Sequence, residues 1–213
     1  PHFIWKVEFV QVAANSTVTF KMILHRFATN AKGSRHMTWV KAYNERGEGK
    51  CIADIINKKK SPFFEEGIDV LLKDHVGKRF AVVSDFTNKN NCDVYFIAVG
   101  TPLDKKNAPS LAYIKKAAET LGNVLKQGDT VILRSTVPLG TTRDVVAPIL
   151  EKKSGLRVGE EFFIAFAPER TIEGKALEEL RALPQVVGGW NRASANIVAN
   201  IFSILTDAVF IVD

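Results

Sequence analysis

Residues 94–99 of this chain are apolar at every position, and Gly100 follows them directly. A strand with one face in water alternates apolar and polar residues, whereas a strand covered on both faces is apolar throughout. Such a strand belongs to a sheet buried between two layers of helices. Shorter runs of similar character occur at residues 80–83, 130–133, 162–166 and 208–212. The chain is therefore expected to build a sheet from several short, buried strands.

Apolar residues between these runs recur every three or four positions, as they do on one face of a helix. This spacing predicts helices at residues 68–76, 111–125, 142–152 and 193–205. Ser110 is the candidate N-cap of the second of these helices. Strands that alternate with helices predict βαβ units, and right-handed crossovers place the helices on both faces of the sheet. We therefore predict an α/β fold with a doubly wound, largely parallel, Rossmann-like sheet.

The first fifty residues do not follow this scheme. A dinucleotide-binding sheet opens with a strand, a glycine-rich turn, a helix, a second strand and an acidic residue. Residues 21–50 show no consistent period, and Gly47 and Gly49 indicate a surface turn because no strand precedes them. We therefore divide the chain into an atypical or disrupted first segment, residues 1–50, and the rest of the α/β domain, residues 51–213.

Charge and cysteine content exclude several classes of partner. The net charge is +6, but the basic residues are scattered and form no stripe interleaved with aromatic residues, so nucleic acid is not an expected partner. A mild positive excess suits an anionic small molecule. No apolar run approaches the ~20 residues that span a bilayer, so no membrane partner is expected. Cys51 and Cys92 lack the spacing of a metal site, which predicts a cytoplasmic chain without bound metal and a packing role for Cys92.

Three predicted strands end in loops rich in hydroxyls, glycine, proline and charge. Ligands bind outside the carboxyl ends of the strands in open α/β sheets, so these loops predict one composite site. Ser135 and Thr136 place hydroxyls at a strand end, where they can bond a phosphate, a ribose or a carboxamide. Thr101 does the same one strand earlier, although the loop there is also compatible with a plain tight turn. Thr141 or Thr142 is expected to cap the next helix.

The third loop, residues 168–174, carries two carboxylates and a guanidinium directly after a buried strand. Glu169 can act as a general base, directly or through a water. Arg170 can grip a phosphate or a carboxylate with two parallel hydrogen bonds. The structural alternative is an exposed ion-pair cluster at the start of a helix over residues 175–181, where Glu173 favours the helix start.

These motifs together resemble the UDP-glucose/GDP-mannose dehydrogenase family, whose members oxidise a nucleotide sugar to its uronic acid with NAD. The motifs that carry the resemblance, in order, are Ser61-Pro-Phe-Phe-Glu-Glu-Gly67, Val99-Gly-Thr-Pro102, Ser135-Thr-Val-Pro-Leu-Gly-Thr-Thr142, Pro168-Glu-Arg170 and Pro184-Gln-Val-Val-Gly-Gly189. The resemblance covers residues 52–213. Arg170, where the UDP-glucose branch usually has Phe, makes the chain look more like the UDP-N-acetyl-D-mannosamine dehydrogenase branch.

The resemblance implies a role for each strand-end loop. It implies a cofactor side for NAD formed by Thr101, Pro102, Ser135, Thr136 and Glu173. It implies a sugar side formed by Arg170, Thr171 and Glu173. Its candidates for a catalytic role are Glu169, which aligns with a carboxylate linked to water activation, and Thr136.

The resemblance also implies what lies outside this chain. The family transfers two hydrides through a thiohemiacetal and a thioester on a cysteine, with a nearby lysine. Neither Cys51 nor Cys92 matches that cysteine, so the nucleophile and the lysine are expected in central and C-terminal domains absent from this fragment. The parent protein is expected to be a homodimer that acts on a UDP-sugar, with UDP-N-acetyl-mannosamine as the expected substrate, in polysaccharide biosynthesis. The alternative is a non-catalytic module that binds a nucleotide or nucleotide sugar.

The family's glycine-rich opening turn and its acidic ribose ligand are missing from residues 1–50. We hypothesise a shifted reading frame there, because the resemblance begins abruptly at Ile52. Gene sequencing tests this hypothesis, which is wrong if no shifted frame upstream encodes a strand, a glycine-rich turn and a helix.

Overall fold

The computed structural model describes residues 18–24, 38–44, 54–61, 65–78, 80–83, 92–104, 107–172 and 174–212, with the backbone alone for the first two ranges. Its strands are β1 (Val18–Leu24), β2 (Thr38–Asn44), β3 (Phe80–Val83), β4 (Val94–Ala98), β5 (Thr130–Leu133), β6 (Phe163–Phe166), β7 (Gln185–Gly189) and β8 (Val209–Val212). Its labelled helices are α2 (Ile68–His75), α3 (Ala112–Gly122), the π-helix η2 (Thr141–Val146), α4 (Ala147–Ser154), α5 (Ala176–Ala182) and α6 (Arg192–Phe202). In these ranges no helix has the length and apolar character needed to cross a bilayer.

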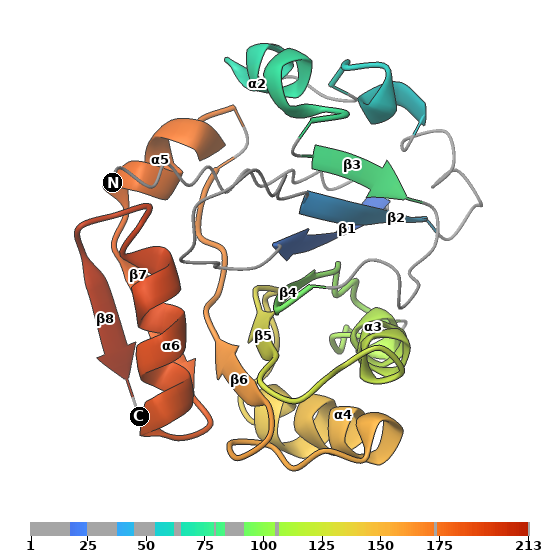
Figure 1. Ribbon diagram of the computed structural model, residues 1–213, viewed down its shortest axis with the longest axis vertical. Helices are drawn as coiled ribbons and strands as arrows, with labels where there is room; N and C mark the ends of the chain where they lie inside the picture. The colour runs from blue at the N-terminus through green and yellow to red at the C-terminus, as the bar shows by residue number, and fades with distance from the viewer. Residues whose placement is uncertain are drawn as a thin grey trace, which may run out of the picture.

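The described strands form one mixed sheet in the order β3-β2-β1-β4-β5-β6-β7-β8 (Figure 1). The first six strands follow the order of a dinucleotide-binding fold. The central strands β4, β5 and β6 are parallel to one another, as are β2 with β3 and β7 with β8. The α/β, Rossmann-like prediction is therefore confirmed, but β1 runs antiparallel to both neighbours and β7 runs antiparallel to β6.

Strands β1 and β2 lie in the segment where no periodic pattern is predicted. Val18, Phe20, Met22 and Leu24 do occupy alternate positions, which is the signal of a half-buried strand. The reversed direction of β1 agrees with the prediction that the first βαβ unit is atypical. A β1 that runs parallel to β4 would end at the same sheet edge as β4, whereas here the start of β1 lies beside the end of β4.

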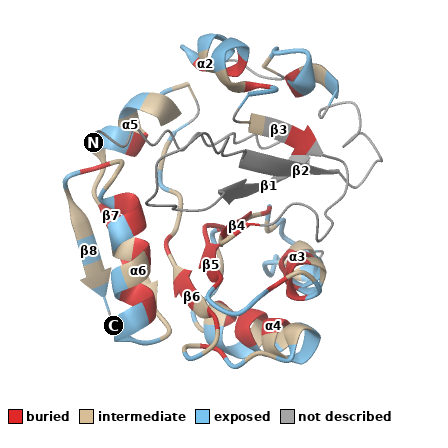
Figure 2. Cartoon of the chain, in the orientation of Figure 1, coloured by how far each residue is buried: buried red, intermediate tan, exposed pale blue. Residues whose placement is uncertain are grey.

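Each face of the sheet has its own hydrophobic core, because neighbouring residues of a strand point to opposite faces. Phe96 of β4 packs in the core covered by α2 and α6, and Ile97 packs in the core covered by α3 and α4. Figure 2 shows that β4 and β5 are buried along most of their length between these layers. The continuous apolar run that predicts a doubly covered strand is thus explained by helices on both faces.

Two helix starts differ from the prediction. Leu111, not Ser110, is the N-cap of α3, and the N–H of Ser110 instead donates to the carbonyl of Pro102. Gly140, with φ +83°, is the N-cap of η2, and no side chain caps that helix. The Thr141 hydroxyl donates to the Pro138 carbonyl at 2.7 Å, so it stabilises the loop before the helix rather than capping it.

Candidate functional site

The parallel strands β4, β5 and β6 end at one edge of the sheet, and the loops that follow them lie there together (Figure 1). These are the three loops in which the sequence places its candidate binding residues. The edge is the position at which open α/β sheets bind ligands.

Hydrogen bonds join the end of β4 to the end of β5. The Thr101 hydroxyl donates to the carbonyl of Thr136 at 2.7 Å, and the Ser135 hydroxyl donates to the carbonyl of Val99 at 2.6 Å. Ser135 is only 7% exposed, so its hydroxyl holds the two strand ends together rather than facing solvent. Thr136 and Pro102 are exposed, and Thr101 is half-buried. Four of the five predicted cofactor-side residues are therefore adjacent, with Ser135 beneath the surface that Thr101, Pro102 and Thr136 form.

The hydroxyl of Thr101 keeps its acceptor lone pairs after it donates to Thr136, because a hydroxyl has one proton and two lone pairs. Gly100 is exposed and carries no side chain, so a ligand can approach the backbone there. Hydroxyls and an open backbone suit the polar groups of a ribose or a carboxamide. These residues fit the part of NAD that would lie over β4 and β5. The link between β1 and β2, where a pyrophosphate turn is sought, lies outside the described residues.

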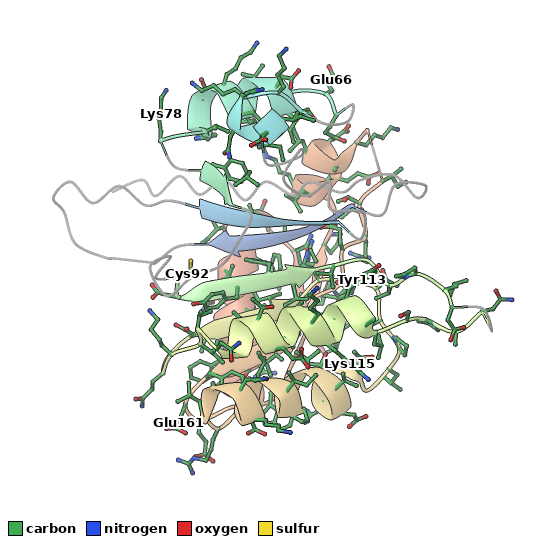
Figure 3. The ribbon with its side chains drawn as sticks, turned by 90° about the vertical axis from the view of Figure 1, so that its right-hand side faces the viewer. Glu66, Lys78, Cys92, Tyr113, Lys115 and Glu161 are labelled. Carbon is green, nitrogen blue, oxygen red and sulfur yellow. The ribbon has the colours of Figure 1, made fainter. Side chains whose placement is uncertain are left out.

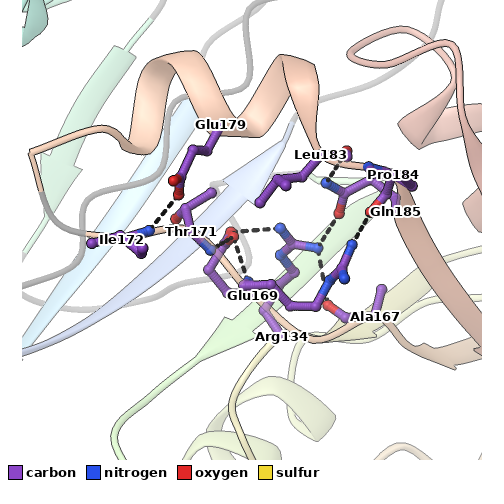
Figure 4. A network of polar contacts seen from close by, with 10 residues as sticks. Arg134, Ala167, Glu169, Thr171, Ile172, Glu179, Leu183, Pro184 and Gln185 are labelled. Carbon is purple, nitrogen blue, oxygen red and sulfur yellow. Dashed lines mark hydrogen bonds and ion pairs between the residues drawn. The ribbon is translucent and has the colours of Figure 1, made fainter.

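A buried arginine that is not among the predicted site residues connects β5 to the third loop (Figure 4). Arg134 is 1% exposed. Its Nη1 donates to the carbonyl of Ala167 at 3.0 Å and to Oε1 of Gln185 at 2.8 Å, and its Nη2 donates to Oε2 of Glu169 at 2.5 Å. Its guanidinium also lies 4.8 Å from the centre of the Phe202 ring. Arg134 thus joins the ends of β5 and β6 to the start of β7.

Burial lowers the pKa of Arg134, and the Glu169 carboxylate opposes that shift. An arginine side chain stays protonated in proteins, so the pair is a buried ion pair. Burying a charge is unfavourable unless it is paired and hydrogen-bonded. The three acceptors around Arg134 meet that requirement, and the ion pair fixes the position of the Glu169 carboxylate.

Glu169 also organises the backbone of its own loop. Its Oε1 accepts the backbone N–H of Arg170 at 2.8 Å and that of Thr171 at 3.0 Å. The exposed Arg170 side chain folds back and donates from Nη2 to the carbonyl of Pro184. Glu169 pairs with a buried arginine, so the alternative of an exposed ion-pair cluster does not describe it. Thr171 is half-buried beside Arg170, and Glu173 lies outside the described residues.

Cys92 lies at the other edge of the sheet. Figure 3 shows Cys92 and Tyr113 at opposite ends of β4, with Tyr113 on the side of the candidate site. Cys92 is fully buried, and burial raises the pKa of its thiol to about 12. A nucleophilic cysteine reacts as the thiolate and is partly exposed. Cys92 therefore packs in the core, as predicted, while Cys51 lies outside the described residues.

Comparison with known proteins identifies relatives of this chain. Residues 49–206 match the UDP-glucose/GDP-mannose dehydrogenase family, NAD binding domain. The UDP-N-acetyl-D-glucosamine 6-dehydrogenase of Pseudomonas aeruginosa is 35% identical over 152 residues, which make up 69% of this chain and 36% of that protein. The UDP-N-acetyl-D-mannosamine dehydrogenase of Campylobacter jejuni is 34% identical over 160 residues, 72% of this chain and 39% of that protein.

A solved structure gives the same result. The ternary complex of GDP-mannose dehydrogenase from Pseudomonas aeruginosa matches with a TM-score of 0.69 and 31% identity, over 76% of this chain and 38% of that chain. The chain thus spans less than half the length of each of these relatives. It belongs to the UDP-glucose/GDP-mannose dehydrogenase family, and the part that matches is the NAD-binding domain.

Proposed function

We propose that this chain is the NAD-binding part of a nucleotide-sugar 6-dehydrogenase that oxidises a UDP-sugar to its uronic acid. The observation that supports this most strongly is that two groups of residues adjoin at one sheet edge. Thr101 and Thr136 form one group at the ends of β4 and β5, and the Glu169–Thr171 loop forms the other after β6. Arg134 lies between the two groups and contacts Glu169.

The first group forms the cofactor side of the proposed site. Thr136 is exposed. The Thr101 hydroxyl donates its hydrogen bond to the carbonyl of Thr136, so its lone pairs accept hydrogen bonds from a ligand. Ser135 holds the ends of β4 and β5 together beneath them, and the exposed Pro102 completes the set. Thr101 and Thr136 would hold NAD at this edge, where the cofactor would supply the hydride acceptor for oxidation of the sugar. The residues of the chain orient the ligand.

The second group forms the sugar side. The guanidinium of Arg170 has five N–H donors, of which the contact with Pro184 uses one nitrogen, so it can also bind a phosphate or sugar oxygen. Thr171 offers a hydroxyl beside it. The Glu169 carboxylate has about four lone-pair positions. Three N–H groups occupy three of them, which leaves one lone-pair position to accept a hydrogen bond from a water. We assign that water to hydrolysis of the thioester that the resemblance implies, in which water adds to the thioester carbonyl and the cysteine thiolate leaves.

UDP-N-acetyl-D-mannosamine is the substrate that we favour, and Arg170 is the residue that supports it. Proteins named for UDP-N-acetyl-D-glucosamine and GDP-mannose are similar at comparable identity. The choice among these three sugars therefore depends on direct measurement. We also propose that the longer protein acts as a homodimer in the cytoplasm.

A second candidate function is a nucleotide-binding module without catalysis. The observation that favours it is Cys92, which is buried at the opposite edge and holds its proton. Under either function, this chain binds ligands and does not supply the nucleophile from its described residues.

Isothermal titration calorimetry of the chain with NAD, and with each of the three nucleotide sugars, tests the proposal. Thr136→Val removes one hydroxyl and is expected to weaken NAD binding about three- to tenfold. Thr120→Val is the matched control, because the Thr120 hydroxyl donates within α3 to the carbonyl of Lys116. Failure of NAD and of all three sugars to bind the wild-type chain would contradict the proposal. Formation of NADH by the longer protein with a UDP-sugar distinguishes the dehydrogenase from the binding module.

A further inference from the structure

Glu65 is a buried carboxylate for which the proposed function has no role. It lies just before α2 and is 7% exposed. Its Oε2 accepts the backbone N–H of Gly174 at 2.8 Å, and its Oε1 accepts the backbone N–H of Leu177 at 3.2 Å. These contacts join residues more than a hundred positions apart in the sequence, and they connect the segment before α2 to the end of the sugar-side loop.

The start of α5 explains why a carboxylate binds there. The first N–H groups of a helix have no partner within the helix, and they favour a negative charge. Lys175 is the N-cap of α5 and makes no capping hydrogen bond with its side chain. Glu65 therefore supplies from a distant segment the acceptor that a local N-cap residue usually supplies.

Carboxylates hold successive N–H groups of the sugar-side loop. Glu169 accepts those of Arg170 and Thr171, and Oε2 of Glu179 accepts that of Ile172 at 2.7 Å (Figure 4). Glu169 and Glu179 belong to the same stretch of chain as the loop. Glu65 is the carboxylate in this set that comes from another part of the fold, so it ties the loop to the body of the domain.

We propose that Glu65 is a positioning residue for nucleotide-sugar binding. It holds residues 170–172 and 174–177 in the conformation that presents Arg170 and Thr171 to the sugar. This inference rests on the proposed function, because it assumes that the loop binds the sugar. The contacts of Glu65 are with the loop after β6, whereas the proposed cofactor side lies after β4 and β5. Its effect is therefore confined to one of the two ligands.

Glu65→Gln tests this role while keeping the size of the side chain. An amide has one acceptor oxygen, so either Gly174 or Leu177 would face an NH₂ group that cannot accept its proton. If about a tenth of the variant chains keep the competent loop, the Kd for UDP-N-acetyl-D-mannosamine rises about tenfold. The Kd for NAD stays unchanged. Glu66→Gln is the matched control, because Glu66 is the next residue, is exposed and lies at the outer surface (Figure 3).

Amide hydrogen exchange provides a measurement that requires no ligand. The amides of Gly174 and Leu177 are expected to exchange slowly in the wild-type chain and faster in Glu65→Gln, while Glu66→Gln matches the wild type. Rapid exchange of both amides in the wild type overturns the proposal, and this holds even if Glu65→Gln fails to fold. Equal loss of NAD and sugar affinity in Glu65→Gln, or a sugar Kd within about twofold of the wild type, also overturns it.

The two ideas fail in different ways. A wild-type chain that binds none of the three nucleotide sugars contradicts the proposed function. The exchange of Gly174 and Leu177 still decides in that case whether Glu65 holds the loop. A wild-type chain that binds the sugar, together with a Glu65→Gln variant that binds it equally well, contradicts the positioning role alone.

Discussion

Replacing Arg134 with Met is expected to destabilise the chain more than any substitution of an exposed charge. Methionine is unbranched and flexible, so it can fill the space of the arginine stem. It cannot replace the three hydrogen bonds to Ala167, Gln185 and Glu169, nor the positive charge beside the Glu169 carboxylate. That carboxylate has a side-chain exposure of 17%, so water compensates it only in part.

The size of the stability loss in Arg134→Met depends on which groups lose a hydrogen-bond or ion-pair partner. Removing one member of a buried ion pair costs about 3–5 kcal/mol, because the remaining charge stays in a poorly solvated position. The carbonyl of Ala167 and the amide of Gln185 lose their donor in the same step, so the upper part of this range applies. We expect Arg134→Met to lower the free energy of unfolding by about 4 kcal/mol. The free energy of unfolding of Arg134→Lys should lie between those of Arg134→Met and the wild type, because a single ammonium group cannot reach acceptors on both sides.

Urea unfolding followed by circular dichroism measures these differences in the 213-residue chain. The double variant Arg134→Met/Glu169→Gln removes the orphaned charge, so its loss should be smaller than the sum of the two single losses, by about 1–3 kcal/mol. Arg157→Met is the matched control. Arg157 contacts Glu160 at 2.8 Å, but its side chain is 69% exposed, so its loss should stay below about 1 kcal/mol.

Two outcomes would refute this reasoning. The first is a loss for Arg134→Met no greater than that for Arg157→Met. The second is strict additivity of the Arg134 and Glu169 substitutions, which would mean that the two side chains do not interact energetically in solution.

Two further substitutions test the packing and the electrostatics of the sheet. Gly189→Ala should lower the free energy of unfolding by about 2 kcal/mol or more, because the added Cβ would lie 2.4 Å from the backbone nitrogen of Ala195. Urea unfolding measures this loss. An unchanged free energy of unfolding would contradict the close approach of α6 to β7. Burial raises the pKa of Asp129 from 3.8 to about 6, so the folded chain keeps a proton that the unfolded chain releases as the pH rises through this range, and stability falls. Between about pH 4 and pH 6, the free energy of unfolding of the wild type should fall by about 1–2 kcal/mol relative to that of Asp129→Asn, with allowance for solvent screening. A difference between the two chains that does not change with pH would contradict the raised pKa of Asp129.

The central part of the fold could be predicted because its signals are local. Each strand from β4 to β6 is a short apolar run, and each run is followed by a polar loop and a helix. The apolar run of β4 alone predicts helices on both faces, and Phe96 and Ile97 confirm this by packing in different cores. The direction of β1 could not be predicted, because alternation along Val18–Leu24 indicates a strand without saying which neighbour it pairs with or in which sense.

The site could be predicted only in part for a related reason. The sequence placed Thr101, Thr136 and Glu169 at strand ends, and the structure brings their loops together. Arg134 was not predicted as a site residue, because its partners lie 33, 35 and 51 positions away and a charged residue at a strand end looks solvated. The position of Ser135 in the sequence likewise does not show that its hydroxyl points inward and donates to the carbonyl of Val99.

The carboxylates that hold the sugar-side loop determine what this loop can offer to a ligand. In a glycine-rich phosphate loop, the backbone N–H groups themselves bind the ligand. Here the N–H groups of Arg170, Thr171, Ile172 and Gly174 are already taken by protein carboxylates. Under the proposed function, the loop therefore recognises its ligand through side chains on a fixed backbone. Ligand preference can consequently change through a single substitution at position 170 or 171 while the path of the chain stays the same.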